Sequence, residues 1–414
     1  MKVLLINNAT THYYNLLLNR LNAVSGLQVT VVTPTEATSN VGVGVYQTRD
    51  GIDFRVCELQ EKSRMGGFSS FKGLTHVVWR EKPDVIIVND GYLLGLLFNI
   101  PLTIIRRLLG TKLILRTIPF RVPTYQAAKD KIRGDWRRFA FLPGALNSAL
   151  ATLGLARLLR WFYLGLVKWS YRASDGHMNY IHDAFRIYGS YGVPKERIFV
   201  TGNSPDTDTL FAARAEVEKL PPVLPPCEHR LIHVGRLVAW KRVDLLLRAH
   251  ARIKKEFLNA ELVVLGDGPE EASLRRLTKE LGVEDSVRFV AGVYKPKHLG
   301  QYLMASSIYV LAGMGGLSIN DAMCFGLPVI CSVCDGTEKI LVRDGFNGKL
   351  FRDGDEDDLV DKIGQLCRNP ELRQKMGVHS TEIIQNEVNI HTVVARYVKA
   401  IEAVTSRRVA PGGK

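Results

Sequence analysis

Residues 308 to 332 read Ile308-Tyr-Val-Leu-Ala-Gly-Met-Gly-Gly-Leu-Ser-Ile-Asn-Asp-Ala-Met-Cys-Phe-Gly-Leu-Pro-Val-Ile-Cys-Ser332. The apolar run 308–312 is typical of a strand buried on both faces, and a short helix is expected over 318–325. The glycines between them let the backbone turn tightly and approach a ligand. A glycine turn that leads into a helix presents free N–H groups and partial positive charge, which suit a phosphate. The alternative is an ordinary packing role for these glycines.

The same alternation of apolar strands and helical patterns runs through the whole chain. Further strands are expected at 3–6, 27–33, 84–88, 112–117, 197–201, 229–234, 261–265, 286–290 and 327–331. Strands separated by helices predict parallel sheets with crossover helices. Because 414 residues exceed what one core usually holds, we predict two doubly wound α/β domains, residues 1–220 and 227–387. A proline-rich linker joins them, and a final helix over 388–405 is expected to pack back on the first domain.

The composition is that of a globular protein, with 46% hydrophobic and 23% charged residues. Six cysteines do not form a disulfide framework, which favours a reducing cytoplasm. Cys331 and Cys334 have the spacing of a metal-binding pair, but no second pair follows, so we interpret them as small apolar residues. The N-terminal apolar run is too short for a signal peptide, and no metal site is expected.

Positive charge is concentrated in one part of the first half. The net charge is +14, and residues 106–172 contain 14 Lys and Arg against only two Asp. Such a field attracts a polyanion or an anionic membrane surface. Within it, residues 146–169 form a long apolar helical pattern that carries Arg157, Arg160 and Lys168 along one stripe. This composition indicates a helix lying in a membrane interface, or alternatively a core helix whose charged heads reach solvent.

Candidate binding residues follow the ends of five strands in the second half. They are Gly235, Arg236 and Lys241 after the first strand, Gly266 after the second, Val293 after the third, Gly315, Gly316 and Leu317 after the fourth, and Glu338 after the fifth. In an open parallel sheet, ligands bind at the carboxyl ends of the strands, so these residues are expected to surround one crevice. Arg offers a fork of donors and Lys a point charge, a pair suited to a diphosphate.

The second half resembles the C-terminal domain of family-four retaining glycosyltransferases of the GT-B fold. Residues 235–247, 263–269, 287–293, 316–330 and 342–351 carry the resemblance. It implies two Rossmann-like domains facing a cleft, and retaining transfer of a sugar from a nucleotide diphosphate sugar with no metal or other cofactor. In this fold the leaving phosphate is usually held to take the acceptor proton, so no dedicated base is required.

The resemblance also implies roles for individual residues. Arg236 and Lys241 would clamp the donor diphosphate and stabilise the charge that grows as the glycosidic bond breaks. Asp321, where the family has a glutamate, would bind the ribose hydroxyls. The remaining donor-binding candidates would contact phosphate (Gly315 and Gly316), the nucleobase (Val293), donor hydroxyls (Glu338) or the donor generally (Gly235, Gly266 and Leu317).

The sequence departs from the family at several positions. Gly313 stands where the family carries the first of two acids, so the acid that would touch the transferred sugar is missing. The loop over 7–12 lacks the usual glycine pair, and no histidine follows the strand 112–115. From the first domain, His12, Arg116, Arg121 and His182 are candidates to contact the acceptor or the sugar.

These observations favour a retaining glycosyltransferase that acts on a membrane-held, lipid-linked glycan in the synthesis of a cell-surface polysaccharide. We expect it to be cytoplasmic and peripheral on the inner face of the membrane, with residues 106–172 docked on anionic lipid. One alternative is an epimerase or hydrolase of a nucleotide sugar, for which Gly313 leaves room. Another is a non-catalytic polyanion-binding protein. Because the motifs lie outside the basic half and no nucleic-acid-binding signature appears, we expect no nucleic-acid partner.

Overall fold

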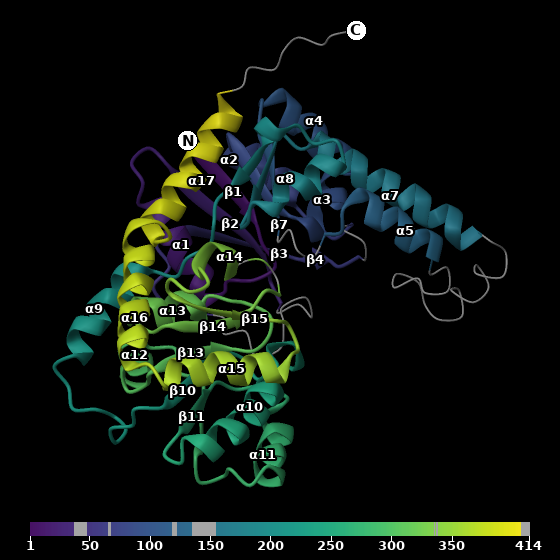
Figure 1. Cartoon of the computed structure of the whole chain (residues 1–414). Coiled ribbons are helices and arrows are strands. Elements are labelled where there is room, and N and C mark those ends of the chain that lie inside the picture. Colours follow the sequence, from purple (N-terminus) through teal and green to yellow (C-terminus); the bar gives the residue numbers. More distant parts are fainter. Residues whose placement is uncertain are drawn as a thin grey trace. The chain divides into compact units, whose positions relative to one another are not determined.

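The computed structural model describes residues 1–36, 48–64, 68–117, 122–134, 155–334, 336 and 338–406. The chain divides into two compact units (Figure 1). Unit 1 comprises Met1–Gly202 and Val394–Lys414, and unit 2 comprises Asn203–Val393. Each unit contains a parallel sheet with helices, which confirms the predicted fold class of two doubly wound α/β domains.

Unit 1 is built on a seven-stranded sheet of order β3-β2-β1-β6-β7-β8-β9, in which all pairings are parallel. The strands are β1 Lys2–Ile6, β2 Gln28–Pro34, β3 Arg55–Leu59, β6 Val85–Asn89, β7 Lys112–Thr117, β8 Gly176–Asn179 and β9 Ile198–Val200. The helices are α1 His12–Asn22, α2 Leu74–Glu81, α3 Asp90–Leu97, α4 Ile100–Leu108, α5 Tyr125–Gly134, α7 Leu155–Ala173 and α8 Asp183–Ser190. A short antiparallel pair, β4 Glu61–Lys62 and β5 Ser70–Phe71, lies beside them.

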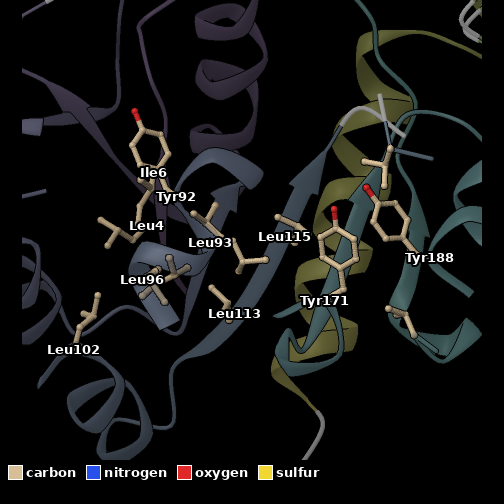
Figure 2. Packing of buried hydrophobic residues seen from close by; sticks show 14 of the residues in the cluster. Leu4, Ile6, Tyr92, Leu93, Leu96, Leu102, Leu113, Leu115, Tyr171 and Tyr188 are labelled. Carbon is tan, nitrogen blue, oxygen red and sulfur yellow. The ribbon is translucent and has the colours of Figure 1, made fainter. Parts of the chain in front are cut away.

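The core of unit 1 lies against the central strands. Leu4 and Ile6 of β1 and Leu113 and Leu115 of β7 are at most 2% exposed, as expected for strands covered on both faces. Figure 2 shows these side chains together with Leu93, Leu96 and Tyr92 of α3 and with Tyr171 and Tyr188. Strand β6 reads Val-Ile-Ile-Val before Asn89, and such β-branched runs favour buried strands.

Unit 2 has a six-stranded parallel sheet of order β12-β11-β10-β13-β14-β15. Its strands are β10 Arg230–Val234, β11 Glu261–Leu265, β12 Val287–Val290, β13 Ile308–Leu311, β14 Val329–Ser332 and β15 Gly348–Phe351. Its helices are α9 Thr207–Val217, α10 Val243–Glu256, α11 Glu271–Glu280, α12 Pro296–Met304, α13 Ser318–Cys324, α14 Glu338–Leu341, α15 Glu356–Cys367 and α16 Pro370–Asn386. The last long helix, α17 Ile390–Thr405, starts in unit 2 and continues into unit 1.

The structure differs from the sequence-based expectations at a few elements. Helix α9, placed by the predicted boundaries in the first domain, packs on α12 within unit 2, so the change of unit comes at 202/203 rather than at the prolines. Helix α7 ends at Ala173, and the part of the expected long helix over 146–154 lies outside the described residues. Strand β15 and helix α16 were not predicted.

No single helix among the described residues has the length and apolar composition needed to cross a membrane. Helices α3 and α4 pass this test only as a pair, and they meet at 87°. Leu93 and Leu96 of α3 are buried in the core of unit 1, at 1% and 2% exposure. Helix α3 is therefore part of the packed interior of this unit.

Candidate functional site

The loop after β10 and the glycine turn after β13 meet at the carboxyl edge of the unit 2 sheet. Lys241 is buried, and its Nζ donates hydrogen bonds to the carbonyl oxygens of Met314 at 2.8 Å and Gly315 at 2.6 Å. The guanidinium of Arg236 lies 5.7 Å from the centre of the Trp240 ring. The two predicted phosphate-binding cations thus belong to one loop, and Lys241 is fixed directly against the glycine turn.

Gly313 is held in a position that has no room for a side chain. A Cβ atom added there would lie 2.3 Å from the carbonyl oxygen of Trp240 and 2.8 Å from the carbonyl carbon of Lys241. The N–H of the next residue, Met314, donates to the same Trp240 oxygen at 2.9 Å. An acidic side chain at position 313 would therefore clash with the backbone of the loop after β10, which the sequence alone did not indicate.

The loop after β11 joins the same rim. Gly266 has a φ of +147°, and a Cβ atom on it would lie 2.0 Å from the carbonyl oxygen of Gly235. Leu237 N–H donates to Asp267 O at 2.9 Å, which links the same two loops. Only glycine satisfies both the backbone conformation and the close approach at 266. The predicted residues at 235, 236, 241, 266, 315 and 316 are thus brought together on three neighbouring loops.

Beneath this rim lies His233, a residue that the sequence analysis did not select. It is fully buried in β10, and its Nδ1 is 3.3 Å from the carbonyl oxygen of Val310. Burial and the nearby positive charge of Lys241 lower the pKa of His233 to about 4. The imidazole is consequently neutral at physiological pH and adds no positive charge below the cations.

Asp321 lies in α13, one turn beyond the glycine turn, and Leu317 precedes this helix. Burial raises the pKa of Asp321 to about 7. Next to it, Tyr309 of β13 donates its hydroxyl to Ser318 Oγ at 2.7 Å. A carboxyl group with a pKa near 7 is present in both protonated and ionised forms at neutral pH. It can therefore donate or accept a hydrogen bond, which suits recognition of hydroxyl groups.

Val293 and Glu338 lie on loops that are tied to their neighbours. Val293 follows β12 and is half-buried against the unit 2 core, and the adjacent Gly292 N–H donates to Asp267 Oδ2 at 2.9 Å. Glu338 is 1% exposed, and its Oε1 accepts from Cys334 N at 3.1 Å and from Gly336 N at 2.9 Å. The structure therefore shows Glu338 ordering its own loop, and its predicted contact with donor hydroxyls stays a prediction.

The candidates from unit 1 do not form one described cluster. His12 begins α1, and burial lowers its pKa. His182 precedes α8, is exposed, and stacks on Phe185 with 6.3 Å between ring centres. Arg121 lies outside the described residues. The predicted roles of His12 and His182 at the acceptor or the sugar stay predictions.

Arg116, the fourth candidate, is enclosed by three tyrosines. Its Nε donates to Tyr397 of α17 at 2.9 Å, and its Nη2 donates to the Tyr180 hydroxyl. The guanidinium also lies 4.2 Å from the centre of the Tyr14 ring on α1. Arg116 therefore has a structural role, because its side chain links β7, α1 and α17 within unit 1.

Two doubly wound units, one of which gathers cations and close-packed glycine loops at the carboxyl edge of its sheet, define the GT-B class of proteins. HepE of Anabaena, solved in complex with UDP, shares this fold with a TM-score of 0.66 and 15% sequence identity, over 97% of this chain and 100% of that protein. Residues 219–382 match the family described as glycosyl transferases group 1, which confirms the resemblance seen in the sequence.

Two curated relatives each match about two fifths of the chain. An uncharacterized glycosyltransferase of Haemophilus influenzae is 30% identical over 170 residues, which cover 40% of this chain and 47% of that protein. The N-acetyl-alpha-D-glucosaminyl L-malate synthase of Bacillus anthracis is 30% identical over 173 residues, which cover 41% of this chain and 44% of that protein. The chain thus spans slightly less than half the length of the relatives it matches.

Proposed function

We propose that this protein is a glycosyltransferase whose donor is a nucleotide diphosphate sugar. The observation that carries the proposal is the pairing of Arg236 and Lys241 on one loop, with the Lys241 ammonium bonded to the carbonyls of the glycine turn. Cations held by the scaffold in this way bind a diphosphate with little reorganisation. The complex of HepE with UDP supports a site of this kind in the shared fold.

In the proposed reaction, Arg236 and Lys241 bind the two phosphates of the donor. The bond between the anomeric carbon and the β-phosphate oxygen breaks, and both cations stabilise the negative charge that grows on that oxygen. The acceptor hydroxyl attacks on the same face of the sugar, and its proton passes to the leaving phosphate. Configuration is thereby retained, and neither a metal ion nor a separate base is needed.

The other donor contacts follow the predicted roles. Asp321 binds the ribose hydroxyls, Val293 contacts the nucleobase, Gly315 and Gly316 line the phosphate, and Leu317 contacts the donor. Because position 313 admits no side chain, recognition of the transferred sugar does not involve a carboxylate at that position. This is the feature that keeps hydrolysis or epimerisation of the nucleotide sugar as the second candidate reaction.

For the acceptor, we propose a membrane-held, lipid-linked glycan used in cell-surface polysaccharide synthesis. The protein would work from the cytoplasm, peripherally on the inner face of the membrane. The excess of 12 positive charges over residues 106–172 supports this proposal, since basic segments are attracted to anionic lipids. A polyanion held without catalysis is the weaker alternative, because the cations of the candidate site lie in unit 2 and not in this segment.

The test is to incubate the protein with a panel of nucleotide sugars and extracted lipid-linked acceptors, and to measure nucleotide diphosphate and lipid-linked product. Arg236→Ala and Lys241→Ala should each lower kcat/KM by about 100-fold or more. Arg248→Ala, which removes an exposed cation from the same unit, serves as the matched control and should keep full activity.

The outcomes separate the candidate reactions. Product that forms only with acceptor supports transfer, whereas nucleotide release without acceptor would favour hydrolysis and a new sugar epimer would favour epimerisation. If no donor is consumed and both variants bind UDP as tightly as the parent protein, the enzyme proposal is wrong.

A further inference from the structure

Helix α7 presents an apolar face to solvent. Leu158, Phe162 and Trp169 are 66%, 65% and 47% exposed. Their spacing of four and seven residues places them on one side of the helix, whereas Leu164 and Tyr171 on the other side are buried. A surface helix of a globular protein normally has the reverse arrangement, with polar residues facing water.

Helix α4 shows the same arrangement. Ile100, Ile104 and Leu108, each four residues apart, are 69%, 52% and 76% exposed. On its buried side, Arg106 donates to the carbonyl oxygen of Thr111 at 3.3 Å and pairs with Asp175 at 3.4 Å. The packing of α4 therefore turns a charged residue inward and leaves three large aliphatic side chains outside.

Phe98 connects the two helices. It lies between α3 and α4, is 51% exposed, and its ring centre is 5.8 Å from that of Trp169 on α7. Figure 1 shows α3, α4 and α7 within unit 1. We call Phe98, Ile100, Ile104, Leu108, Leu158, Phe162 and Trp169 the α4–α7 apolar surface. Exposed apolar patches of this kind mark sites of interaction with a protein or a membrane.

Cations border this surface. Arg157 and Arg172 are exposed near the two ends of α7, and Arg107 is exposed on α4 beside Leu108. Lys168, on α7 next to Trp169, is partly exposed and lies 4.5 Å from the centre of the Tyr125 ring. Between Ile100 and Ala173 the sequence contains only two acids, Asp130 and Asp135, and Asp175, two residues after α7, is paired with Arg106. Positive charge around an apolar strip is complementary to lipid phosphates.

We propose that the α4–α7 apolar surface docks on an anionic bilayer, with its large side chains in the boundary between headgroups and acyl chains. Helix α7 lies along the membrane plane, and the bordering cations meet lipid phosphates. A second copy of the chain fits this surface poorly, because the same excess of positive charge would be placed on both sides of the contact. The inference deepens the membrane-held acceptor of the proposed function, on which its biological meaning rests, but it is tested without any sugar transfer.

The experiment is flotation of the full chain with phosphatidylcholine vesicles, with and without phosphatidylglycerol. The unchanged protein should float strongly with the anionic vesicles and only weakly with phosphatidylcholine alone. The double variants Ile104→Ser with Leu108→Ser, and Leu158→Ser with Phe162→Ser, should each lower the partition coefficient by roughly tenfold or more, because each removes two exposed apolar side chains that enter the bilayer in the docked state. Raising the salt concentration should weaken binding by the unchanged protein without abolishing it.

A matched control is Leu258→Ser with Val378→Ser, which removes exposed apolar residues from unit 2, at 80% and 54% exposure. This variant should bind vesicles like the unchanged protein. In addition, lipids brominated near the headgroup should quench the fluorescence of Trp169. The contribution of this residue is the difference in quenching between the unchanged protein and Trp169→Phe. Amide hydrogen exchange in the strands of the unit 1 sheet that matches the unchanged protein shows that unit 1 remains folded in these variants, and binding of UDP shows the same for unit 2.

The proposal is wrong if both apolar double variants bind vesicles as tightly as the unchanged protein. It is also wrong if brominated lipids quench the fluorescence of Trp169→Phe as much as that of the unchanged protein. Dimerisation through these residues without vesicle binding would assign the surface to a second copy instead. Either result could occur while UDP binding and sugar transfer persist. Failure of the docking proposal can therefore be distinguished from failure of the proposed enzyme function.

Discussion

Gly313 shows how a single residue can be misread from sequence. In the sequence it is a lost acid, and in the structure it is the contact point between two binding loops. Any side chain would meet the backbone of Trp240 and Lys241, at 2.3 and 2.8 Å from its Cβ. A main chain in contact with a main chain cannot rotate away, so the loops would have to separate.

We therefore expect Gly313→Ala to destabilise unit 2 by about 1–3 kcal/mol, which is typical of overpacking. It should also weaken UDP binding, because Lys241 would move with its loop. Thermal unfolding and UDP titration measure the two effects. Gly189→Ala, on an open helical surface with no atom near the added Cβ, should leave the stability unchanged or raise it slightly. Equal melting temperatures for the two variants would contradict the close packing.

Asp321 gives a prediction of pH dependence. Its pKa is raised to about 7 from an ordinary value of 3.8, so between these values the folded state binds a proton that the unfolded state releases. Stability should therefore fall as the pH rises through this window, by about 1.4 kcal/mol for each unit of pKa difference. Asp321→Asn should remove this part of the slope in urea unfolding measured at several pH values. Asp353→Asn, at an exposed site, should leave the dependence of stability on pH unchanged. If Asp321→Asn keeps the slope of the unchanged protein, burial does not raise the pKa of Asp321.

Site residues were predictable from sequence where the chemistry is local. Gly235, Arg236 and Gly266 directly follow strand ends, Lys241 ends the loop that begins at Gly235, and the structure brings these residues together at one edge. Arg116 shows the limit, since its position at the end of β7 is compatible with a ligand contact. Its tyrosine partners are 64 and 281 residues away in sequence, and no local pattern indicates them.

At the scale of an element, Arg116 fixes the last helix onto unit 1. Its partly buried guanidinium donates hydrogen bonds to Tyr397 of α17 and to Tyr180, and a hydrogen bond from a charged group contributes about 1.5–3 kcal/mol. Arg116→Lys keeps the charge but loses the forked geometry. We expect faster amide hydrogen exchange in α17 after Val393 and a loss of stability of this size.

The control for this prediction is Lys399→Ala, which removes an exposed cation from the same helix and should not change the exchange of its neighbours. If Arg116→Lys exchanges like the unchanged protein throughout α17, the helix is held by its apolar contacts alone. Those contacts include Tyr397, Ala400, Ile401 and Val404, none of which is measurably exposed.

Elements were predicted best where the periodicity was simple. Strands β1, β7, β10 and β11 lie within a residue of their expected bounds, because short apolar runs between helices have few other interpretations. Helix α4 was not predicted, because apolar residues occur on both of its sides and give no clear helical periodicity. Which of its two sides faces water depends on the neighbouring α2 and α3, which the sequence of α4 does not specify.

At the scale of the whole molecule, the two units carry different charges. Unit 1 holds 31 Lys and Arg against 14 Asp and Glu, and unit 2 holds 24 against 27. Net charges of +17 and −3 follow, so the capacity to meet an anionic surface is confined to unit 1. The cations of the candidate donor site lie in the nearly neutral unit, where their local arrangement and not the overall field determines binding.

This division predicts the pattern of protection by a nucleotide. UDP should slow amide hydrogen exchange in the loops 235–242, 266–270 and 313–318 and leave the strands of the unit 1 sheet unchanged, because every proposed nucleotide contact lies in unit 2. Hydrogen exchange with mass spectrometry on the full chain measures this, and Lys241→Ala should remove the protection. Equal protection over the strands of unit 1 would place part of the nucleotide site elsewhere.

The path of the chain has a consequence for its synthesis. Unit 1 consists of two segments, and unit 2 lies between them in the sequence, so α17 is the last part of unit 1 to leave the ribosome. Until α17 is made, the apolar residues of Met1–Gly202 that it covers have no partner. Most of unit 1 has already been synthesised by then. Unit 2 is one continuous segment and can fold while unit 1 still lacks its last helix. We therefore expect C-terminal truncations before residue 394 to yield nascent chains in which the first-made unit, and not the last-made one, is held by chaperones or degraded.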